Sequence, residues 1–460
     1  MKMLITVSGL GWQDEKRYIR DVVKGLEAVG HTVTVGVEEN SRALAEYEQA
    51  GLTVQAVPSY DLETLGAVAT LARLIRAEVP RLICVTGHHD AVAVHRVLKD
   101  EPGDIVRVVY RQSAYPFDPI DETRDLLGAT DLVLAASKEQ AERHFRPFVD
   151  AGVLDRQQIE VVADAVRGDG EPDASSADRE TFRERFGLTD RDFALAVAGE
   201  LTWETGVDRV IRVLAELRKE QDPYPVLLIA GQGPLETELR ALAAEEGVAD
   251  RVRFLGAEGE PTEHLLVACD AVVLATEVPA PGALVLKEAM ALGRPVLASI
   301  VGGIPEFVAD EGHGFLFGDE EDLQDAVRRM LADPPQLARM GESARRSIRE
   351  GHRLEQRVNY LAYRLDLLAL ERSPFPAVLD DFAWDEVRLR KESEGGFVFV
   401  PHTSYITELG PTSFGVVSAS IERGTVSELA HAGAARELAC QLYEMGALKR
   451  HPAPEPAALA

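Results

Sequence analysis

Three groups of residues have types and spacings that suit ligand binding or acid–base chemistry. His88 and His89 follow a short apolar run. A histidine titrates near neutral pH, so it suits the role of a general base or of a side chain that binds a substrate. Glu288 lies in an apolar helical stretch, where a carboxylate can accept hydrogen bonds from two neighbouring hydroxyl groups. Gly302 and Gly303 are adjacent and would let a ligand approach the backbone closely.

The same residues also have structural interpretations. The two histidines could begin a helix, with Asp90 as a favourable charge in its first turn. Glu288 could be a solvated helix residue, and the glycine pair could form a turn. No metal site is indicated, because the cluster of His88, His89 and Asp90 would need further ligands that the sequence does not place nearby.

The elements that must position these residues follow a strand–helix rhythm. The first set of apolar, β-branched runs is Met3–Leu10, Thr32–Val37, Val54–Pro58, Leu82–Thr86, Ile105–Tyr110, Leu132–Ser137 and Ile159–Asp164. The second set is Phe193–Gly199, Val226–Gly231, Val252–Gly256, Ala271–Ala275, Pro295–Ile300 and Gly314–Phe317. Near-continuous apolar strands separated by helices indicate parallel sheets covered on both faces. The chain is therefore expected to contain two Rossmann-like α/β domains that face a cleft, with ligands at the carboxyl ends of the strands.

Breaks in these patterns predict the domain boundaries. A polar stretch at 167–178 separates a first domain, residues 1–166, from a second, residues 179–352. After SPFP at 373–376 the pattern changes to a hairpin followed by three helical stretches, which indicates a small winged-helix-like domain at 380–450.

Composition excludes several classes of partner. The 460 residues carry a net charge of −28, which opposes binding to nucleic acid and to anionic membranes. Stable membrane insertion is not expected, because no run of about 18 apolar residues occurs. The three cysteines are far apart, and two lie in apolar runs, so we expect buried thiols in a cytoplasmic protein. The sequence does not indicate an oligomeric state.

The second half resembles the nucleotide-sugar-dependent family-4 glycosyltransferases at several positions in order. The matching segments are AGELTWETGVDRVIRVLAEL (198–217), LLIAGQGPLETELRALA (227–243), VRFLG (252–256) and LVLKEAMALGRPVLASIVGGIPEFV (284–308). In the first half, the turn at Gly30–Val33 and the segments ATDLVLAAS (129–137) and IEVVADAV (159–166) are also similar to the family, so the resemblance covers about residues 1–372. It implies the GT-B fold, a helix at 353–372 that crosses back to the first domain, and a retaining, metal-independent transfer from a nucleotide sugar, with no other cofactor.

The resemblance also implies roles for individual residues. The donor-binding residues would be Gly11, Gly199, Gly256, Gly282, Ala283, Leu284, Glu288 and Gly303. Glu288 would accept hydrogen bonds from ribose hydroxyls, and the helix that begins near 282–284 would point its N–H groups at the diphosphate. The candidate catalytic residues are His88, Arg111 and Glu277, and the candidate acceptor-binding residues are His89 and Tyr115.

Four positions depart from the family pattern. Glu200 and Thr205 stand where the family places cations that neutralise the leaving diphosphate, Ala280 replaces a glutamate, and Ser113 stands where a histidine is common.

Three explanations of these departures remain open. Arg111, Arg294 or Lys287 could supply the cations for an unusual donor. The alignment could be shifted near 277–282, with Glu277 in place of Ala280. The site could also have lost catalysis and only bind a ligand.

The tail resembles the small peptide-recognition domain typified by the pyrroloquinoline-quinone D-type chaperone, a RiPP recognition element. The segment that carries this resemblance runs from Trp384 to Arg450 and includes GTVSELA. A precursor peptide would add as a strand to the edge at Phe397–Val400, and the contacting residues would be Phe397, Phe399, Leu438 and Leu442. The alternatives are a packing module or a dimer contact. Two hypotheses follow: a glycosyltransferase, for which a ribosomally made peptide is one candidate acceptor, or a catalytically silent scaffold that binds the peptide for a partner enzyme.

Overall fold

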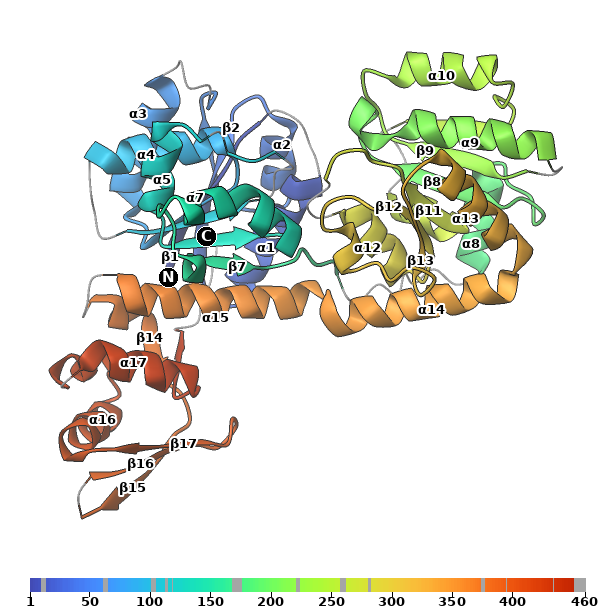
Figure 1. The fold of residues 1–460 in the computed structure, drawn as a ribbon. Helices are drawn as coiled ribbons and strands as arrows, with labels where there is room; N and C mark the ends of the chain where they lie inside the picture. The colour runs from blue at the N-terminus through green and yellow to red at the C-terminus, as the bar shows by residue number, and fades with distance from the viewer. Residues whose placement is uncertain are drawn as a thin grey trace, which may run out of the picture.

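The computed structural model shows two α/β lobes joined side by side and a smaller domain below the first lobe (Figure 1). It describes residues 1–9, 14–60, 65–100, 105–111, 115–117, 119–167, 176–220, 224–256, 262–279, 283–373, 377–393, 395–432 and 434–450. We call residues 1–167 the N-terminal lobe, residues 176–352 the C-terminal lobe and residues 377–450 the tail domain.

The N-terminal lobe is built on a seven-stranded parallel sheet in the order β3-β2-β1-β4-β5-β6-β7. Its strands are β1 (Lys2–Val7), β2 (Thr32–Glu38), β3 (Val54–Val57), β4 (Leu82–Val85), β5 (Val106–Arg111), β6 (Leu132–Ala135) and β7 (Ile159–Val161). Its helices are α1 (Asp14–Ala28), α2 (Arg42–Gln49), α3 (Leu65–Glu78), α4 (His88–Asp100), α5 (Asp121–Gly128), α6 (Lys138–Gln140), η1 (Ala141–Phe145), α7 (Arg146–Asp150) and η2 (Arg156–Gln158). The central strands are buried along nearly their whole length, because helices cover both faces of a parallel sheet.

The C-terminal lobe repeats this plan with six parallel strands in the order β10-β9-β8-β11-β12-β13. The strands are β8 (Ala194–Ala198), β9 (Val226–Ala230), β10 (Val252–Gly256), β11 (Ala271–Leu274), β12 (Val296–Ser299) and β13 (Gly314–Phe317). The helices are α8 (Ser176–Arg185), η3 (Trp203–Thr205), α9 (Val207–Glu220), α10 (Glu236–Glu245), α11 (Thr262–Ala268), α12 (Leu284–Ala291), η4 (Ile304–Glu306), α13 (Glu320–Ala332) and α14 (Pro334–Gly351). Every strand of both sheets overlaps a predicted apolar run, so the expectation of two Rossmann-like domains is confirmed.

The chain crosses between the lobes twice at one place. The Val166 amide donates to the His352 carbonyl at 2.9 Å, and the Leu354 amide donates to the Val166 carbonyl at 2.7 Å. Helix α15 (Leu354–Arg372) then runs back under the N-terminal lobe and packs on α1 (Figure 1). A Cβ on Gly25 of α1 would lie 2.5 Å from the Val358 side chain, so glycine allows the two helices to pack closely.

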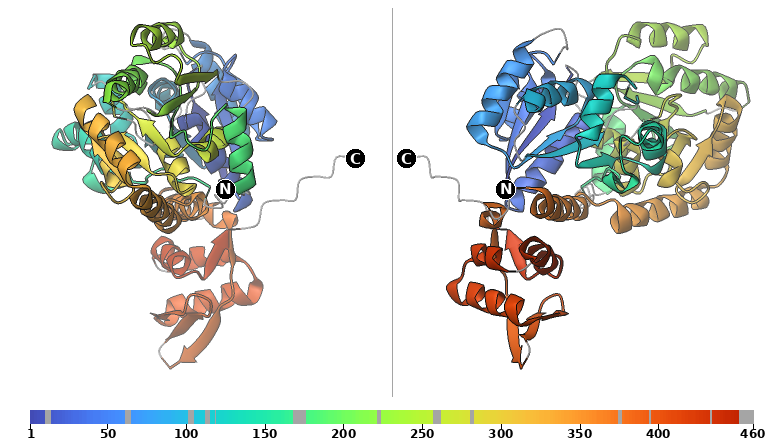
Figure 2. Two further views of the ribbon diagram at one scale, coloured as in Figure 1. Left: turned by 90° about the vertical axis from the view of Figure 1, so that its right-hand side faces the viewer. Right: turned by 60° about the vertical axis from the view of Figure 1, so that its left-hand side comes forward.

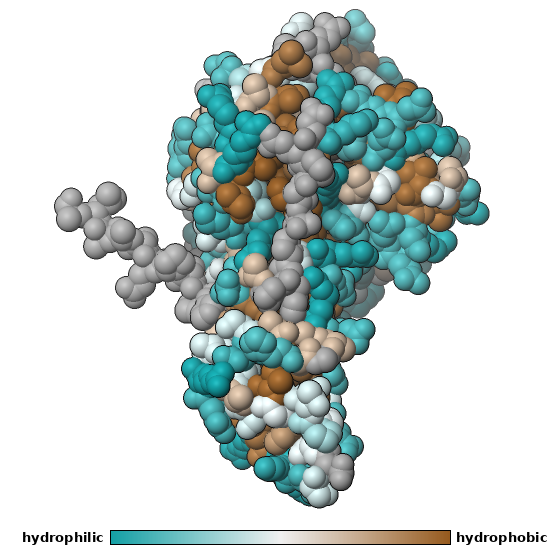
Figure 3. All heavy atoms as spheres, turned by 90° about the vertical axis from the view of Figure 1, so that its left-hand side faces the viewer, coloured by the Kyte–Doolittle hydropathy of each residue, from teal (hydrophilic) through white to brown (hydrophobic). Residues whose placement is uncertain are grey.

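The tail domain contains a three-stranded antiparallel sheet in the order β15-β16-β17 and a short second sheet, β14-β18. Its elements are η5 (Ala377–Asp381), β14 (Phe382–Trp384), β15 (Arg388–Glu392), β16 (Gly395–Val400), β17 (Tyr405–Leu409), α16 (Pro411–Arg423), η6 (Val426–His431), α17 (Ala435–Glu444) and β18 (Leu448–Arg450). The predicted hairpin and helical stretches are present, but β14, β15 and β18 were not expected. Figure 2 shows this domain projecting away from both lobes, and Figure 3 shows its mixed hydrophilic and hydrophobic surface.

Polar and aromatic contacts attach the tail domain to the crossing helix. The Tyr443 hydroxyl donates to the Asp366 carboxylate at 2.9 Å, and the Tyr443 ring stacks on Tyr363 with the ring centroids 5.6 Å apart. Arg450 forms a buried ion pair with the same Asp366. The tail domain is therefore fixed to α15, the helix that joins the two lobes.

Candidate functional site

A cavity of about 560 Å³ lies between the lobes, where α1 faces α11 and α12. We call it the interlobe cavity. The N-terminal lobe lines it with Arg17, Tyr18, Arg20, Asp21, Ala165, Val166 and Arg167. The C-terminal side lines it with Thr262, Glu263, Leu266, Leu284, Glu288, Ala291, Leu292 and, from the crossing helix, Leu354. The predicted donor-binding residues Leu284 and Glu288 therefore lie in one wall of this cavity.

The Glu288 carboxylate is held by an arginine from the opposite lobe. Arg17 Nη1 donates to Glu288 Oε1 at 2.6 Å, and Arg17 Nη2 donates to Oε2 at 3.1 Å. Each of the two side chains is 25% exposed, so the pair is partly shielded from water. Both carboxylate oxygens thus accept hydrogen bonds across the cleft, in the manner expected for two ribose hydroxyls. The sequence reasoning missed Arg17, because its partner lies 271 residues away.

Helix α12 begins in an unusual backbone conformation. Ala283 has φ 42° and ψ 48°, a left-handed geometry that is unfavourable for residues other than glycine. Within the described residues, no side chain caps the start of this helix. The N–H groups of its first turn and the positive end of its dipole therefore suit an anionic ligand.

Glycines hold the carboxyl ends of β8, β9 and β10 together. The Gly199 amide donates to the Ala230 carbonyl at 3.0 Å, and the Gly231 amide donates to the Gly256 carbonyl at 3.0 Å. A Cβ on Gly231, where φ is +152°, would lie 1.8 Å from the Gly199 carbonyl oxygen, so no larger residue fits without movement. The predicted donor-binding residues Gly199 and Gly256 are thereby tied to neighbouring strand ends.

The loop that contains Gly303 leads to a second contact between the lobes. Gly303 immediately precedes η4, the short helix that ends at Glu306. The Glu306 carboxylate accepts hydrogen bonds from the backbone amides of Lys138, at 2.9 Å, and Glu139, at 2.8 Å, at the start of α6. Glu306 therefore acts as a cap, supplied by the C-terminal lobe, for a helix of the N-terminal lobe.

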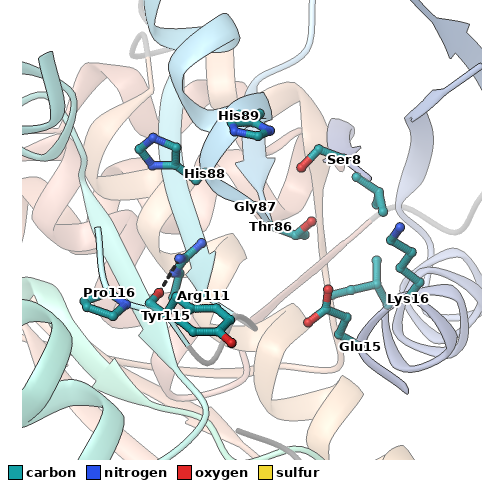
Figure 4. A pocket seen from close by; sticks show the side chains of 12 residues that line it. Ser8, Glu15, Lys16, Thr86, Gly87, His88, His89, Arg111, Tyr115 and Pro116 are labelled. Atoms are coloured by element: carbon teal, nitrogen blue, oxygen red, sulfur yellow. Dashed lines mark hydrogen bonds between the residues drawn. The ribbon is translucent and has the colours of Figure 1, made fainter. Parts of the chain in front are cut away.

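A second cavity, of about 380 Å³, lies at the carboxyl ends of β1, β4 and β5, and Figure 4 shows it from close by. We call it the N-lobe cavity. It is lined by Val7, Ser8, Glu15, Lys16, Ile19, Thr86, Gly87, His88, His89, Arg111, Tyr115 and Pro116. The structure thus brings together His88, His89, Arg111 and Tyr115, the residues predicted for catalysis and acceptor binding in the first domain.

Histidines 88 and 89 begin α4 and differ in exposure. His88 is half-buried, with its ring centroid 5.4 Å from that of Phe117, whereas His89 is exposed. Asp90 is fully buried, and its carboxylate accepts from the Thr6 and Ser8 hydroxyls and from the amides of residues 86 and 87. Asp90 therefore organises the turn between β4 and α4, while the histidines remain at the cavity.

Arg111 is the most deeply buried cation of the N-lobe cavity. Its side chain is 2% exposed, Nη2 donates to the Tyr115 carbonyl, and the guanidinium carbon lies 4.4 Å from the centroid of the Phe117 ring. Burial lowers the pKa of the guanidinium to about 10, which leaves it charged at neutral pH. Tyr115 is 54% exposed, and its hydroxyl donates to Glu204 of the C-terminal lobe.

One of the residues that depart from the family pattern, Glu200, interacts electrostatically with a lysine from the other lobe. Glu200 is exposed, and the Thr205 hydroxyl donates to the Thr202 carbonyl at 2.8 Å. Lys16 is 3% exposed, and burial is the main cause that lowers the pKa of its amine, while the charge of Glu200 is among those that raise it. Lys16 is thus close enough to Glu200 to interact electrostatically, and the sequence reasoning had not singled it out.

Residues 178–347 match a family model described as glycosyl transferases group 1. They form a glycosyltransferase group 1 domain. This segment spans nearly all of the C-terminal lobe, including every strand of its sheet and the Glu288 helix.

Two curated relatives agree with this match. The GDP-mannose-dependent alpha-(1-6)-phosphatidylinositol monomannoside mannosyltransferase of Mycolicibacterium smegmatis is 29% identical over 74% of this chain and 84% of its own length. The alpha-D-kanosaminyltransferase of Streptomyces kanamyceticus is 34% identical over 37% of this chain and 44% of its own length.

Solved glycosyltransferase structures share the fold. Anabaena Alr3699/HepE in complex with UDP superposes with a TM-score of 0.67 and 20% identity, over 79% of this chain and 99% of that protein. A glycosyltransferase from Rickettsia africae gives a TM-score of 0.69 and 16% identity, over 81% of this chain and 99% of its own. The expected GT-B architecture is therefore confirmed.

Two of the three candidate cations donate to backbone carbonyls, Arg294 within the glycosyltransferase domain and Lys287 across to the N-terminal lobe. Arg294 donates from Nε and Nη2 to the carbonyls of residues 266 and 267 at 3.0 and 2.8 Å. Lys287 is buried, and its Nζ donates to the Asp164 carbonyl at 2.9 Å. Neither residue lines the interlobe cavity or the N-lobe cavity. Of the three candidates, Arg111 lines the N-lobe cavity.

Glu277 lies apart from the other predicted catalytic residues. Its side chain is 61% exposed, with one carboxylate oxygen 4.0 Å from Arg209 Nε. It lines a third cavity with Trp203, on the α9–α10 side of the glycosyltransferase domain. The structure therefore does not bring Glu277 together with His88 and Arg111. Gly11, Gly282, Ser113 and Ala280 lie outside the described residues.

The tail domain places the predicted peptide-binding residues differently from the expectation. Strand β16, which contains Phe397 and Phe399, is the central strand of its sheet, so the expectation of a free edge at Phe397–Val400 was wrong. The free edges belong to β15 and β17. Phe397 and Phe399 are half-buried, whereas Leu438 and Leu442 are buried and form part of the hydrophobic core.

Among the residues that the structure describes, no group of three histidine, cysteine or acidic side chains is arranged to hold a metal ion. Nor does any helix there have the length and apolar character required to span a membrane.

Proposed function

We propose that this chain transfers a sugar from a nucleoside diphosphate sugar, bound in the interlobe cavity, to an acceptor bound at the N-lobe cavity. The observation that carries the proposal is the position of Glu288, in a cavity wall between two lobes and within a glycosyltransferase group 1 domain. The relative from Mycolicibacterium smegmatis is named for GDP-mannose, and Anabaena Alr3699/HepE was solved with UDP and with UDP-glucose. These names support a nucleotide-sugar donor.

In this proposal the two lobes divide the work. Glu288 releases Arg17 and accepts hydrogen bonds from the ribose hydroxyls, while the first turn of α12 receives the diphosphate. Gly199, Gly256 and Gly303 allow the backbone to approach the donor closely. Lys16, in the wall of the N-lobe cavity, interacts electrostatically with Glu200 and offsets part of the negative charge that Glu200 brings to this loop.

We propose further that the transfer retains the anomeric configuration and needs no metal ion. The bond between the anomeric carbon and the diphosphate oxygen breaks, and the acceptor oxygen bonds to that carbon. The proton of the acceptor hydroxyl passes to a base, for which His88 is the candidate because it is half-buried in the N-lobe cavity. Side-chain cations and helix amides then carry the leaving-group charge, a task that a metal ion performs in other transferases.

The acceptor that we propose is a ribosomally made peptide captured by the tail domain. The support is an outer strand, β17, with large exposed apolar side chains: Tyr405 is 60% exposed and Ile406 is 63% exposed. A peptide could add to such a strand through main-chain hydrogen bonds. The test uses fluorescence anisotropy to measure the binding of a synthetic peptide whose sequence is encoded beside this gene. Ile406→Asp should weaken binding at least fivefold, and Leu65→Asp, at a still more exposed site on α3, should not.

A second function is favoured by the loop after β8. Glu200 replaces a cation with an anion there, and Thr205 donates its hydroxyl to its own turn instead of to a ligand. A catalytically silent scaffold that binds a peptide for a partner enzyme would tolerate both changes. It predicts peptide binding without release of nucleoside diphosphate from any donor.

A panel of nucleoside diphosphate sugars separates the two functions. Calorimetry should show micromolar or tighter binding of at least one donor, and mass spectrometry should show its nucleoside diphosphate being released. Glu288→Gln should weaken donor binding at least tenfold. Glu263→Gln is the matched control, because it alters an exposed carboxylate of the same cavity on α11. If no donor binds, the transferase proposal fails; if donors bind without turnover, the scaffold is favoured.

A further inference from the structure

The Arg111 guanidinium is a buried cation with unused hydrogen-bond donors. Its Nη2 donates to the Tyr115 carbonyl, but among the described residues no protein group accepts a hydrogen bond from Nε or Nη1. A buried charge is normally paired and hydrogen-bonded, because removing its hydration is costly. Figure 4 shows this guanidinium beside Tyr115 and below His88 at the N-lobe cavity.

The nearby carboxylates do not supply the missing partner. Asp90 directs each of its oxygens to two other donors, a hydroxyl of β1 or its following loop and a backbone amide of residue 86 or 87. Glu15 lines the same cavity and attracts Arg111 electrostatically. Within the described residues, no carboxylate approaches the Arg111 nitrogens closely enough to form an ion pair. The guanidinium is therefore prepared for an acceptor group that the N-lobe cavity itself does not provide.

We propose that the N-lobe cavity binds an anionic group of the acceptor, a phosphate or a carboxylate, on the Arg111 guanidinium. Planar guanidinium donors match the oxygens of both groups, and the cavity volume of about 380 Å³ has room for the group together with the hydroxyl that receives the sugar. Lys16 adds a second positive charge to the cavity wall, and His88 and His89 stand at the start of α4, whose dipole also favours an anion.

The position of the cavity favours the acceptor over the donor as the source of the anion. Every residue that lines the N-lobe cavity comes from the N-terminal lobe, whereas Glu288 and the start of α12 line the interlobe cavity. The assignment to the acceptor rests on the proposed transferase function. The existence of an anion site on Arg111 does not.

The test is calorimetric titration of the full chain with inorganic phosphate and with acetate, at constant ionic strength. At least one anion should bind, and the anion that binds more tightly shows whether the cavity prefers a phosphate or a carboxylate. Arg111→Met should weaken its binding at least tenfold. Arg107→Met, which alters a half-buried arginine four residues earlier on β5 and outside the N-lobe cavity, should change it less than twofold. Arg111→Lys should retain part of the affinity, because it keeps the charge.

Each other outcome has a distinct meaning. If neither anion binds to the unaltered chain, or if Arg111→Met binds as tightly, the anion site is refuted, whether or not the variants are stable. If a saturating nucleoside diphosphate displaces the anion, the site belongs to the donor and the acceptor assignment is refuted. Nucleotide binding is measured separately, through its dependence on Glu288. If the transferase proposal fails, the titrations of the Arg111 variants therefore still decide whether the anion site exists.

Discussion

Removing Arg17 is expected to tighten nucleotide binding. Arg17 occupies both oxygens of the Glu288 carboxylate, and in our account the ribose hydroxyls need those same oxygens. The donor must therefore displace Arg17 before it can bind. Arg17→Met removes the competing donors and keeps much of the side-chain volume.

The magnitude follows from the geometry of the ion pair. The two hydrogen bonds, at 2.6 and 3.1 Å, form a bidentate arginine–carboxylate contact, and both side chains are 25% exposed. Exposed pairs contribute about 0.2–1 kcal/mol and charge-assisted hydrogen bonds about 1.5–3 kcal/mol, so a partly shielded pair falls at about 1–2 kcal/mol. At 1.4 kcal/mol per tenfold change, nucleotide affinity should rise roughly 5- to 30-fold.

The assay is calorimetric titration of the full chain and of Arg17→Met with the nucleoside diphosphate that binds best. Arg20→Met is the matched control, because Arg20 lines the same cavity on the same helix but pairs with Asp21. The control should bind like the unaltered chain. Weaker binding by Arg17→Met would refute the reasoning, since it would mean that Arg17 binds the nucleotide instead of competing with it.

Three further predictions concern lobe closure, a buried lysine and a glycine. Glu306→Ala removes the carboxylate that accepts from two amides of α6, so the radius of gyration in small-angle scattering should increase without ligand; an unchanged value would contradict the role of this contact. Burial lowers the pKa of Lys287 from 10.5 to about 8, so between these pH values the unfolded chain binds more protons than the folded one. From pH 8 to 10.5 the free energy of unfolding should therefore rise by about 3 kcal/mol more than that of Lys287→Met, at 1.4 kcal/mol per pKa unit. Urea titrations at several pH values measure this free energy, and the same pH dependence in both chains would disprove the prediction. Gly231→Ala should displace the Gly199 loop and weaken nucleotide binding at least tenfold in calorimetry, because its Cβ would meet a backbone oxygen at 1.8 Å. Gly51→Ala, also at positive φ but in open space, should leave binding unchanged.

The sequence predicted the two sheets because buried parallel strands leave a strong local signal. Strands such as β4 and β11, with sequences LICV and AVVL, are buried at every residue and must be apolar throughout. Strand β15 carries no such signal, because RLRKE is a charged, mostly exposed edge strand. Strands β14 and β18 have three residues each and pair across more than 60 residues of chain, so no local sequence pattern predicts them.

The candidate site was predicted where residues belong to a local pattern and missed where they meet across the lobes. Glu288, Gly199 after β8 and Gly256 at the end of β10 were found because they fall in recognisable segments. Arg17 was missed because it lies on the polar side of an ordinary amphipathic helix, and only the closure of the cleft gives it a partner. Lys16 has a weak signal, since it belongs to a charged run, DEKR, soon after the first strand. The edge strand of the tail domain was misplaced because the unexpected β15 makes β16 central.

The structure of a complex with a nucleoside diphosphate tests the central claim most directly. The account predicts the nucleotide in the interlobe cavity, with its ribose hydroxyls within hydrogen-bonding distance of the Glu288 carboxylate, its phosphates at the start of α12, and Arg17 displaced. A nucleotide bound elsewhere, or a Glu288 that stays paired with Arg17 while nucleotide is present, would contradict it.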